Sequence, residues 1–208
     1  MSDDLIFYTN PMSRGRIARW MLEEVGQPYR TEILGYGTSM KDPAYLAINP
    51  MGKVPAIKHG ATIVTECAAI CAYLADAFPQ AGLAPPPAGR GDYYRWMFFA
   101  AGPLEAAVTN KALGVDPSEK KTMVGYGSFD ETIDTLERAV IGKLYVAGDS
   151  FSAADVYVGS QIGWGTMFGS IAPRPAFTDY LARIHSRPAY IRAAGIDDAL
   201  MPREKQPA

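Results

Sequence analysis

The alternation of hydrophobic and polar positions predicts strands and helices in turn over roughly the first 80 residues. A short apolar run at 4–9 is typical of a buried strand. Apolar residues then recur at helical spacing from 13 to 26, and a glycine ends the segment, as it ends many helices. The segment 28–34 indicates a second strand. These three segments predict a strand–helix–strand unit with a right-handed crossover.

The pattern continues to Pro79 with shorter elements. A short irregular helix is predicted at 42–50, and two strands joined at His59–Gly60 are predicted within 53–66. An apolar stripe then indicates another helix, which Pro79 ends. This order of elements resembles a thioredoxin-like domain, so we expect an α/β N-terminal domain at 1–80.

A change of composition separates this part from the rest of the chain. The stretch 80–92 is rich in Pro, Gly and Ala and has no periodicity, which is typical of an interdomain linker. Beyond it no segment has a strand pattern, and helical spacing occurs at 92–108, 127–142, 152–168 and 176–187. We therefore expect an all-α C-terminal helical domain at 90–208.

The overall composition and charge exclude several kinds of function. Hydrophobic residues make up 48% and charged residues 20% of the 208 residues, and the net charge is −2. These values are ordinary for a globular domain. Basic and acidic residues are interspersed, so the sequence predicts no nucleic-acid surface. No basic amphipathic tract and no long apolar run indicates contact with a membrane.

The N-terminus and the cysteine content favour a cytoplasmic protein. The first residues lack the basic and apolar regions of a signal peptide. The only cysteines, Cys67 and Cys71, stand four positions apart in a predicted helix, which is poor geometry for a disulfide. Reduced thiols are the simpler expectation. The two histidines, His59 and His185, are far apart in sequence, so no metal site is predicted.

The stretch from Asn10 to Gly15 places a hydroxyl group and positive charge at a predicted helix start. If the first strand ends near residue 9, Ser13 stands at the amino end of the helix. Unpaired N–H groups and the helix dipole favour an anion there, such as a thiolate. Arg14 and Arg16 add positive charge. The alternative is that Ser13 only caps the helix.

Two further stretches have the chemistry of a peptide-binding site. In the first, Lys53 supplies a positive charge, and a bend at Pro55 leaves the main chain of Val54 able to pair with a peptide-like ligand. At a second predicted helix start, Glu66 suits an ammonium group and the N–H groups at Cys67 suit a carboxylate. The alternatives are an ordinary turn before an edge strand and an acidic residue that stabilises the helix dipole.

Together these stretches resemble the cytosolic glutathione S-transferase family, bacterial type. The sequences NPMSRGR, NPMGKVPAI and ECAAICAYL occur in the order and spacing of that family. In the helical part, FSAADVYVG at 151–159 resembles the family's capping-box motif, and HSRPAYIRA at 185–193 resembles one of its helix boundaries. The resemblance spans nearly the whole chain. It implies a transferase that uses glutathione as co-substrate in detoxification.

The resemblance assigns a part of glutathione to each stretch. Lys53 is expected near the glycine carboxylate, and Val54, preceding a cis Pro55, is expected to pair with the cysteinyl part. Glu66 and Cys67 are expected to hold the γ-glutamyl group. The family has Ser or Thr where this chain has Cys67, and a thiol is a weaker donor, so we expect weaker glutathione binding. A reactive Cys67 that forms a mixed disulfide with glutathione is the alternative.

Within the same resemblance, Ser13 is the residue expected to activate the glutathione thiol, with Asn10 and Arg14 as supports. Ser13 matches the position of the Cys used by one bacterial class, and Asn10 falls near the Tyr of several animal classes. Tyr8 lies within the predicted strand, so we expect it in the core. One hydrogen bond to the bound thiolate lowers the thiol pKa by roughly one to two units.

The second substrate is expected to be a hydrophobic electrophile. Aromatic residues are dense in two helical segments, which suggests an apolar pocket at the domain junction. The residues assigned to it are Met12, Trp96, Phe99, Trp164 and Phe168. The alternative for each ring is a place in the core. The resemblance also implies a homodimer.

Two other functions stay open on the sequence alone. One is a glutathione-dependent thiol–disulfide or peroxide reductase of the same fold, although Ser13 has no redox-active sulfur. The other is a protein that binds glutathione or an apolar ligand without catalysing a reaction.

Overall fold

A four-stranded sheet organises the N-terminal part of the chain in the computed structural model, which describes residues 4–201. In sequence its strands are β1 (Leu5–Thr9), β2 (Arg30–Ile33), β3 (Ala56–His59) and β4 (Thr62–Thr65). In space they follow the order β2-β1-β3-β4. β1 is parallel to β2, whereas β3 is antiparallel to both β1 and β4. The predicted thioredoxin-like arrangement of the N-terminal domain is confirmed.

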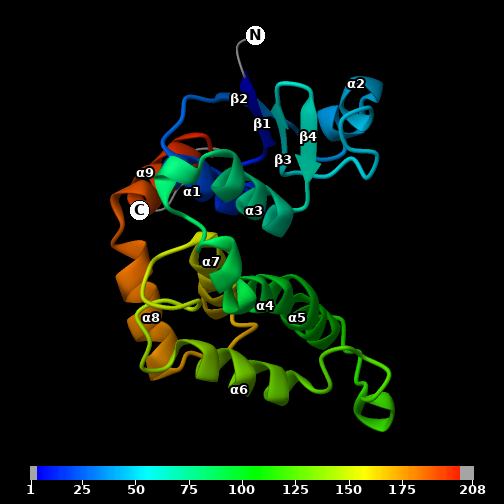
Figure 1. Ribbon diagram of the computed structural model, residues 1–208. Coiled ribbons are helices and arrows are strands. Elements are labelled where there is room, and N and C mark those ends of the chain that lie inside the picture. Colours follow the sequence, from blue (N-terminus) through cyan, green and yellow to red (C-terminus); the bar gives the residue numbers. More distant parts are fainter. Residues whose placement is uncertain (1–3, 202–208) are drawn as a thin grey trace. The chain divides into compact units, whose positions relative to one another are not determined.

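Helices from both ends of the chain cover this sheet. Figure 1 shows α1 (Gly15–Val25), α3 (Cys67–Ala77) and α9 (Pro188–Ala199) side by side, and α1 packs against both of the others. The short α2 (Pro43–Leu46) follows a 3₁₀ turn, η1 (Ser39–Lys41). Another 3₁₀ turn, η2 (Pro79–Ala81), follows α3, where Pro79 was predicted to end the helix.

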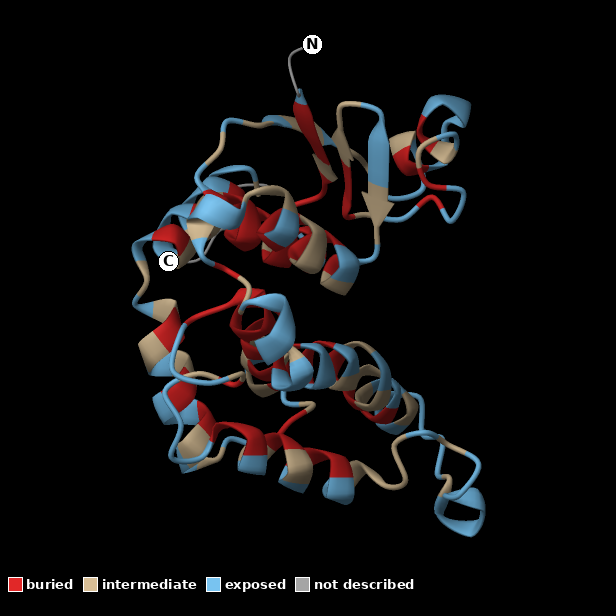
Figure 2. Cartoon of the chain, in the orientation of Figure 1, coloured by how far each residue is buried: buried red, intermediate tan, exposed pale blue. Residues whose placement is uncertain are grey.

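The central strand β1 is buried on both faces, as Figure 2 shows. Successive side chains of a strand point to opposite faces of the sheet. Phe7 therefore faces Arg19 of α1, whose guanidinium carbon lies 5.1 Å from the ring centre. Tyr8 points the other way and packs against a buried cluster that includes Met40 and Tyr45. Its place in the core agrees with the expectation from the sequence.

The rest of the chain forms a helical unit. It contains η3 (Pro87–Gly89), α4 (Gly91–Phe99), a π-helical turn η4 (Ala100–Leu104), α5 (Glu105–Ala112), η5 (Ser118–Lys120), α6 (Phe129–Val140), α7 (Ala153–Met167) and α8 (Pro175–His185). Pro103 lies inside the π turn. Because proline lacks an N–H group, the wider turn is a common way to keep a helix continuous at such a residue.

The division into units differs at one point from the predicted domains, 1–80 and 90–208. The described chain separates into 4–83 together with 187–201 as one unit, and 84–186 as the other. The first boundary falls within the predicted linker. The last helix, however, groups with the sheet because α9 packs along α1. Residues 1–3 and 202–208 of the predicted ranges lie outside the described residues, and the functional roles given to the two domains stay predictions.

A buried ion pair joins α9 to α1. Arg19 Nε lies 2.7 Å from Asp197 Oδ1, and the two side chains are 2% and 1% exposed. Arg19 Nη1 also donates to the Tyr29 hydroxyl at 3.1 Å. Burial raises the pKa of Asp197 more than the charge of Arg19 lowers it. The pair has therefore lost much hydration, and each charge depends on its partner.

We predict that Asp197→Ala lowers the free energy of unfolding by about 3–5 kcal/mol, because it leaves the buried Arg19 charge without a counterion. Urea denaturation measures this loss. The control is Asp134→Ala, which removes one of two carboxylates on the more exposed Arg174 and is expected to cost less than about 1 kcal/mol. Equal losses in the two variants would contradict the structural importance assigned to the buried pair.

Candidate active site

The register of the sheet brings three separate segments to one edge. Tyr8 pairs with Ala56, and Ala56 pairs with Thr65. The carboxyl end of β1, the amino end of β3 and the carboxyl end of β4 therefore share this edge. The segments that adjoin them there are Asn10–Arg14, Lys53–Pro55 and Glu66–Cys67, which include every site residue predicted for glutathione.

The β1–α1 loop (Asn10–Arg14) is fixed by its own hydrogen bonds and by those of neighbouring segments. Asn10 Nδ2 donates to the Leu34 carbonyl at 2.8 Å, and Asn10 Oδ1 accepts the Met12 N–H at 2.9 Å. The Tyr36 hydroxyl donates to the Met12 carbonyl at 3.3 Å. Asn10 is thus a buried anchor of the loop rather than a group that faces a ligand.

Ser13 follows at the start of α1 and is 8% exposed. Its hydroxyl donates to the Asn10 carbonyl at 2.7 Å and accepts the Gly15 N–H at 2.9 Å. The serine oxygen thus satisfies an N–H group of the first turn, although Arg14 and not Ser13 occupies the N-cap position. The Asn10 carbonyl also accepts the Ser13 N–H at 3.1 Å. It consequently keeps one donor if the serine hydroxyl turns elsewhere.

Gly15 allows α1 to begin against the end of β1. A Cβ atom at this position would lie 1.9 Å from Thr9 Oγ1 and 2.9 Å from Ser13 Oγ. Contacts below 3 Å force a shift, and Thr9 is fully buried. The absence of a side chain at Gly15 therefore sets where the first turn, and with it Ser13, lies relative to the sheet.

The segment before β3 presents a main chain with unused hydrogen-bonding groups. The Val54–Pro55 peptide bond is cis, as the resemblance implied. The Lys53 carbonyl accepts the Tyr45 hydroxyl at 2.6 Å and Asn49 Nδ2 at 2.8 Å, and burial raises the pKa of Tyr45 to about 12. Among residues 4–201, the N–H and C=O groups of Val54 have no hydrogen-bond partner in the protein. The Lys53 side chain is exposed.

The start of α3 has an unusual backbone conformation. Of the described non-glycine residues, only Glu66 has a positive φ, at 65°, and its side chain is exposed. Such conformations carry a cost and cluster at functional sites. The neighbouring Cys67 is 8% exposed, and its sulfur donates to the Arg14 carbonyl at 3.4 Å. This contact ties the start of α3 to the start of α1.

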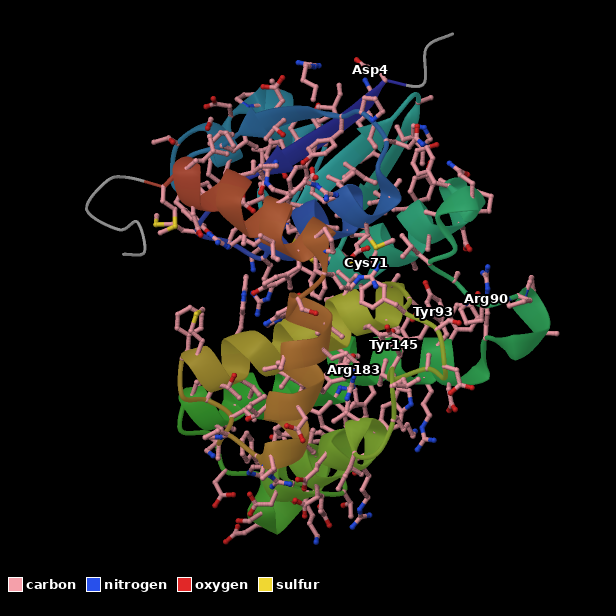
Figure 3. All side chains as sticks on the ribbon, turned by 90° about the vertical axis from the view of Figure 1, so that its left-hand side faces the viewer. Asp4, Cys71, Arg90, Tyr93, Tyr145 and Arg183 are labelled. Atoms are coloured by element: carbon pink, nitrogen blue, oxygen red, sulfur yellow. The ribbon has the colours of Figure 1, made fainter. Side chains whose placement is uncertain are left out.

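The second cysteine has a different environment. Cys71, labelled in Figure 3, is fully buried in α3. A hydrogen bond with Cys67, together with burial, raises the pKa of the Cys71 thiol well above its usual value. Both cysteines are free thiols. Both are also buried, whereas reactive thiols are usually partly exposed.

The residues predicted for the hydrophobic pocket come from both units. Met12 is 44% exposed in the β1–α1 loop. In the helical unit Trp96 is buried, with its ring 5.5 Å from that of Phe99, so it belongs to the core. Trp164 is half-buried and Phe168 is exposed at the end of α7. A pocket formed jointly by these residues stays a prediction.

A groove of about 600 Å³ lies at the other end of α1, away from Ser13. Its polar walls include Glu23, which accepts the Tyr29 hydroxyl at 2.8 Å and pairs with Arg192 at 3.1 Å. The side chains of Glu23, Tyr29 and Arg192 are thus already paired with one another. Within residues 4–201 no cluster of three or more His, Cys, Asp or Glu is placed to hold a metal ion. None of the helices described there has the length and apolar character needed to cross a membrane.

Several residues that shape this edge have little or no signal in the local sequence. Asn49, the first residue of the NPMGKVPAI stretch, binds the Lys53 carbonyl from four positions away. Tyr36 and Tyr45 fix the main chain of the site through hydrogen bonds over 24 and 8 positions. No local pattern marks them. Gly15 had a weak signal, since a glycine inside the first turn of a predicted helix usually has a packing reason.

Comparisons with known proteins agree with this geometry. A sequence profile described as "Glutathione S-transferase, N-terminal domain" matches residues 12–77. Glutathione S-transferase GstA of Escherichia coli is 29% identical over 123 residues, which span 58% of this chain and 61% of that protein, or less than two thirds of its length. Glutathione S-transferase A of Pleuronectes platessa is 28% identical over 183 residues, with 81% of each protein covered.

Solved structures match almost the whole chain. A glutathione transferase from Methylococcus capsulatus has a TM-score of 0.76 at 27% identity, covering 94% of this chain and 99% of that one. A glutathione transferase homolog from Sulfitobacter, with bound glutathione, has a TM-score of 0.75 at 27% identity, covering 96% and 100%.

We predict that Gly15→Ala lowers the free energy of unfolding by about 1–3 kcal/mol, because the new methyl group collides with Thr9 Oγ1. Gly195→Ala is the matched control: it also adds a methyl group within a helix, but it meets no atom within 4 Å. It is expected to stabilise by up to about 1 kcal/mol. Thr9→Ala should recover part of the loss in the double variant, and urea denaturation of all four proteins tests the collision.

Proposed function

The chain belongs to the glutathione S-transferase family, and we propose that it transfers glutathione to a hydrophobic electrophile. The observation that carries this proposal is the meeting of three segments at one sheet edge. The amino end of α1, the unpaired main chain of Val54 and the start of α3 adjoin it together. Each offers groups that complement a different part of an extended, charged tripeptide.

Glutathione is proposed to lie along this edge as an added strand. The free N–H and C=O groups of Val54 pair with its cysteinyl residue. The exposed ammonium of Lys53 attracts the glycine carboxylate. The exposed carboxylate of Glu66 attracts the γ-glutamyl ammonium, and the main-chain N–H groups at Cys67 hold the carboxylate beside it. The tripeptide cysteine is thereby placed near the start of α1.

Ser13 is proposed to stabilise the bound thiolate by turning its hydroxyl away from the Asn10 carbonyl. That carbonyl retains the Ser13 N–H as a donor, so it is not left without a partner. The exchange replaces a hydrogen bond between neutral groups, worth ~0.5–1.5 kcal/mol, with one to a charged group, worth ~1.5–3 kcal/mol. The difference is about 1 kcal/mol, or roughly one pKa unit below the ordinary thiol value of about 8.5.

Two other features act in the same direction. The dipole of α1 favours negative charge at the amino end of the helix, beside Ser13. The exposed Arg14 adds positive charge at the same place. The sulfur nucleophile belongs to glutathione, so no nucleophilic residue of the protein is required, and the remaining acceleration comes from holding the electrophile close to it.

The electrophile is proposed to lie against an apolar surface. Met12 is exposed beside Ser13, and a flexible thioether suits varied apolar ligands. Phe99, Trp164 and Phe168 are proposed as further contacts, with Trp96 supporting them from the core. By similarity to the family we also propose a homodimer that acts in the cytoplasm in detoxification.

A reductase is not proposed. Reduction of disulfides or peroxides needs a reactive sulfur, and Ser13 has none. Cys67 is buried, and its sulfur donates to the Arg14 carbonyl. Cys67 therefore fits a structural contact between helices better than a redox centre.

We predict that glutathione bound to the wild-type protein titrates about one pKa unit lower than free glutathione, and that Ser13→Ala removes most of this shift. Recording the ultraviolet thiolate band against pH measures both values. Ser13→Thr, which keeps a hydroxyl group, is the matched control and should retain a shift. An unchanged titration in the alanine variant would exclude Ser13 as the activating residue.

We predict that Cys67→Ser strengthens glutathione binding and lowers KM for glutathione about three- to tenfold, because a hydroxyl is a better donor to the γ-glutamyl carboxylate. A C–O bond is also shorter than a C–S bond, so the serine oxygen lies farther from the Arg14 carbonyl. Cys67→Ala is the control and should leave KM near the wild-type value. Steady-state kinetics at varied glutathione concentration measures KM for each protein. Equal KM values for the Cys67→Ser and Cys67→Ala variants would contradict the prediction.

A further inference from the structure

Arg16 connects the β1–α1 loop to the last described helix. Its Nη1 atom donates to the Pro11 carbonyl at 3.3 Å and lies 3.5 Å from the Met201 sulfur. Its Nη2 atom pairs with the carboxylate of Asp198. One planar guanidinium group therefore binds a loop carbonyl and the end of α9 at the same time, a geometry that suits arginine.

The contact with Pro11 acts on a single peptide group. The carbonyl of the Pro11–Met12 peptide is bound by Arg16, and the N–H of the same peptide is bound by Asn10 Oδ1 at 2.9 Å. Both polar atoms of this peptide are thus satisfied, and its plane is fixed from two sides. The next residue along the chain after Met12 is Ser13.

We propose that α9 positions the thiol-activating loop through Arg16, which makes Arg16 and Asp198 positioning residues for the transferase reaction. This inference rests on the proposed function of Ser13. Asp198 binds Arg16, and Arg16 binds the Pro11 carbonyl. Arg16 and Asn10 thus fix the Pro11–Met12 peptide from its two sides, and Ser13 is the next residue. A small displacement of a group that binds the reacting atom has a large effect on rate.

The test has to separate two effects of Arg16 on the thiol pKa and on the rate. One is the geometry of its hydrogen bonds, and the other is its positive charge near the proposed thiolate. The titratable and charged groups around Arg16 are Tyr190, Asp197 and Asp198 of α9 and Arg19 of α1. Arg16→Lys retains the charge but has a single ammonium, which cannot hold Asp198 and the Pro11 carbonyl in the same planar arrangement. Arg16→Met removes both the charge and the hydrogen bonds.

The experiment compares Arg16→Lys, Arg16→Met and Asp198→Asn with wild type. We expect both Arg16 variants to raise the apparent pKa of bound glutathione by about half to one unit and to lower kcat/KM roughly three- to thirtyfold, mainly in kcat. Asp198→Asn keeps an acceptor for Arg16 and is expected to give a smaller change in the same direction. It is also the variant expected to disturb folding least.

Arg192→Met is the matched control. Arg192 also joins α9 to α1, through Glu23 at 3.1 Å, but it does so at the carboxyl end of α1. Its loss should lower thermal stability about as much as the loss of Arg16 and leave the thiol pKa and kcat/KM within about twofold of wild type.

The outcomes separate the inference from the proposed function. A wild-type titration with no lowered thiol pKa would refute the proposed function itself. A lowered pKa that persists in Arg16→Met would overturn the positioning role alone. A wild-type-like Arg16→Lys would overturn it as well, because charge without geometry would then be sufficient, and an Arg192→Met variant as impaired as Arg16→Met would reduce the effect to general stability.

Discussion

The antiparallel pairing of β1 with β3, and of β3 with β4, is the constraint on which the candidate site depends. In the observed register Tyr8, Ala56 and Thr65 form one row, so the sheet ends at the same edge on three strands. If one strand slid along its neighbour by one residue, every side chain of that strand would turn to the opposite face of the sheet. The buried cluster around Tyr45 would then break up. The core therefore fixes the register, and the register assembles a site from three segments of which the first and the last are more than 50 positions apart.

Ser13 holds the β1–α1 loop and is also proposed to bind the thiolate. These two roles do not compete, because the carbonyl of its neighbour Asn10 has a second hydrogen-bond donor. The Asn10 carbonyl accepts two donors from the same serine, the N–H and the hydroxyl. A carbonyl has two lone pairs but is satisfied by one donor. Release of the hydroxyl to a thiolate consequently leaves the loop intact. A serine that lies at the start of a helix and donates to a carbonyl with a second donor is in this way prepared to bind an anion at low cost.

Local patterns in the sequence predict the elements near the site better than they predict the contacts between them. The helix that ends at Gly26 and the helix start at Cys67 each have a short-range signal, and both occur where expected. The cis form of the Val54–Pro55 bond, in contrast, was implied only by the family resemblance. The place of α9 had no such signal, because its contact with α1 joins Arg19 to a residue 178 positions away. Likewise, an aromatic pattern in a helix does not distinguish a ligand contact from a core residue such as Trp96.

The ion pair between Arg19 and Asp197 explains how α9 acts on a site that it does not supply with residues. A buried pair adds little net stability, since desolvation offsets most of the attraction. If α9 moved by one turn, however, both charges would be buried without a partner, which is far more costly. The pair therefore fixes the alignment of α9 along α1. That alignment places Asp198, the next residue, beside Arg16, and so extends the constraint from the buried middle of α1 to the loop at its amino end.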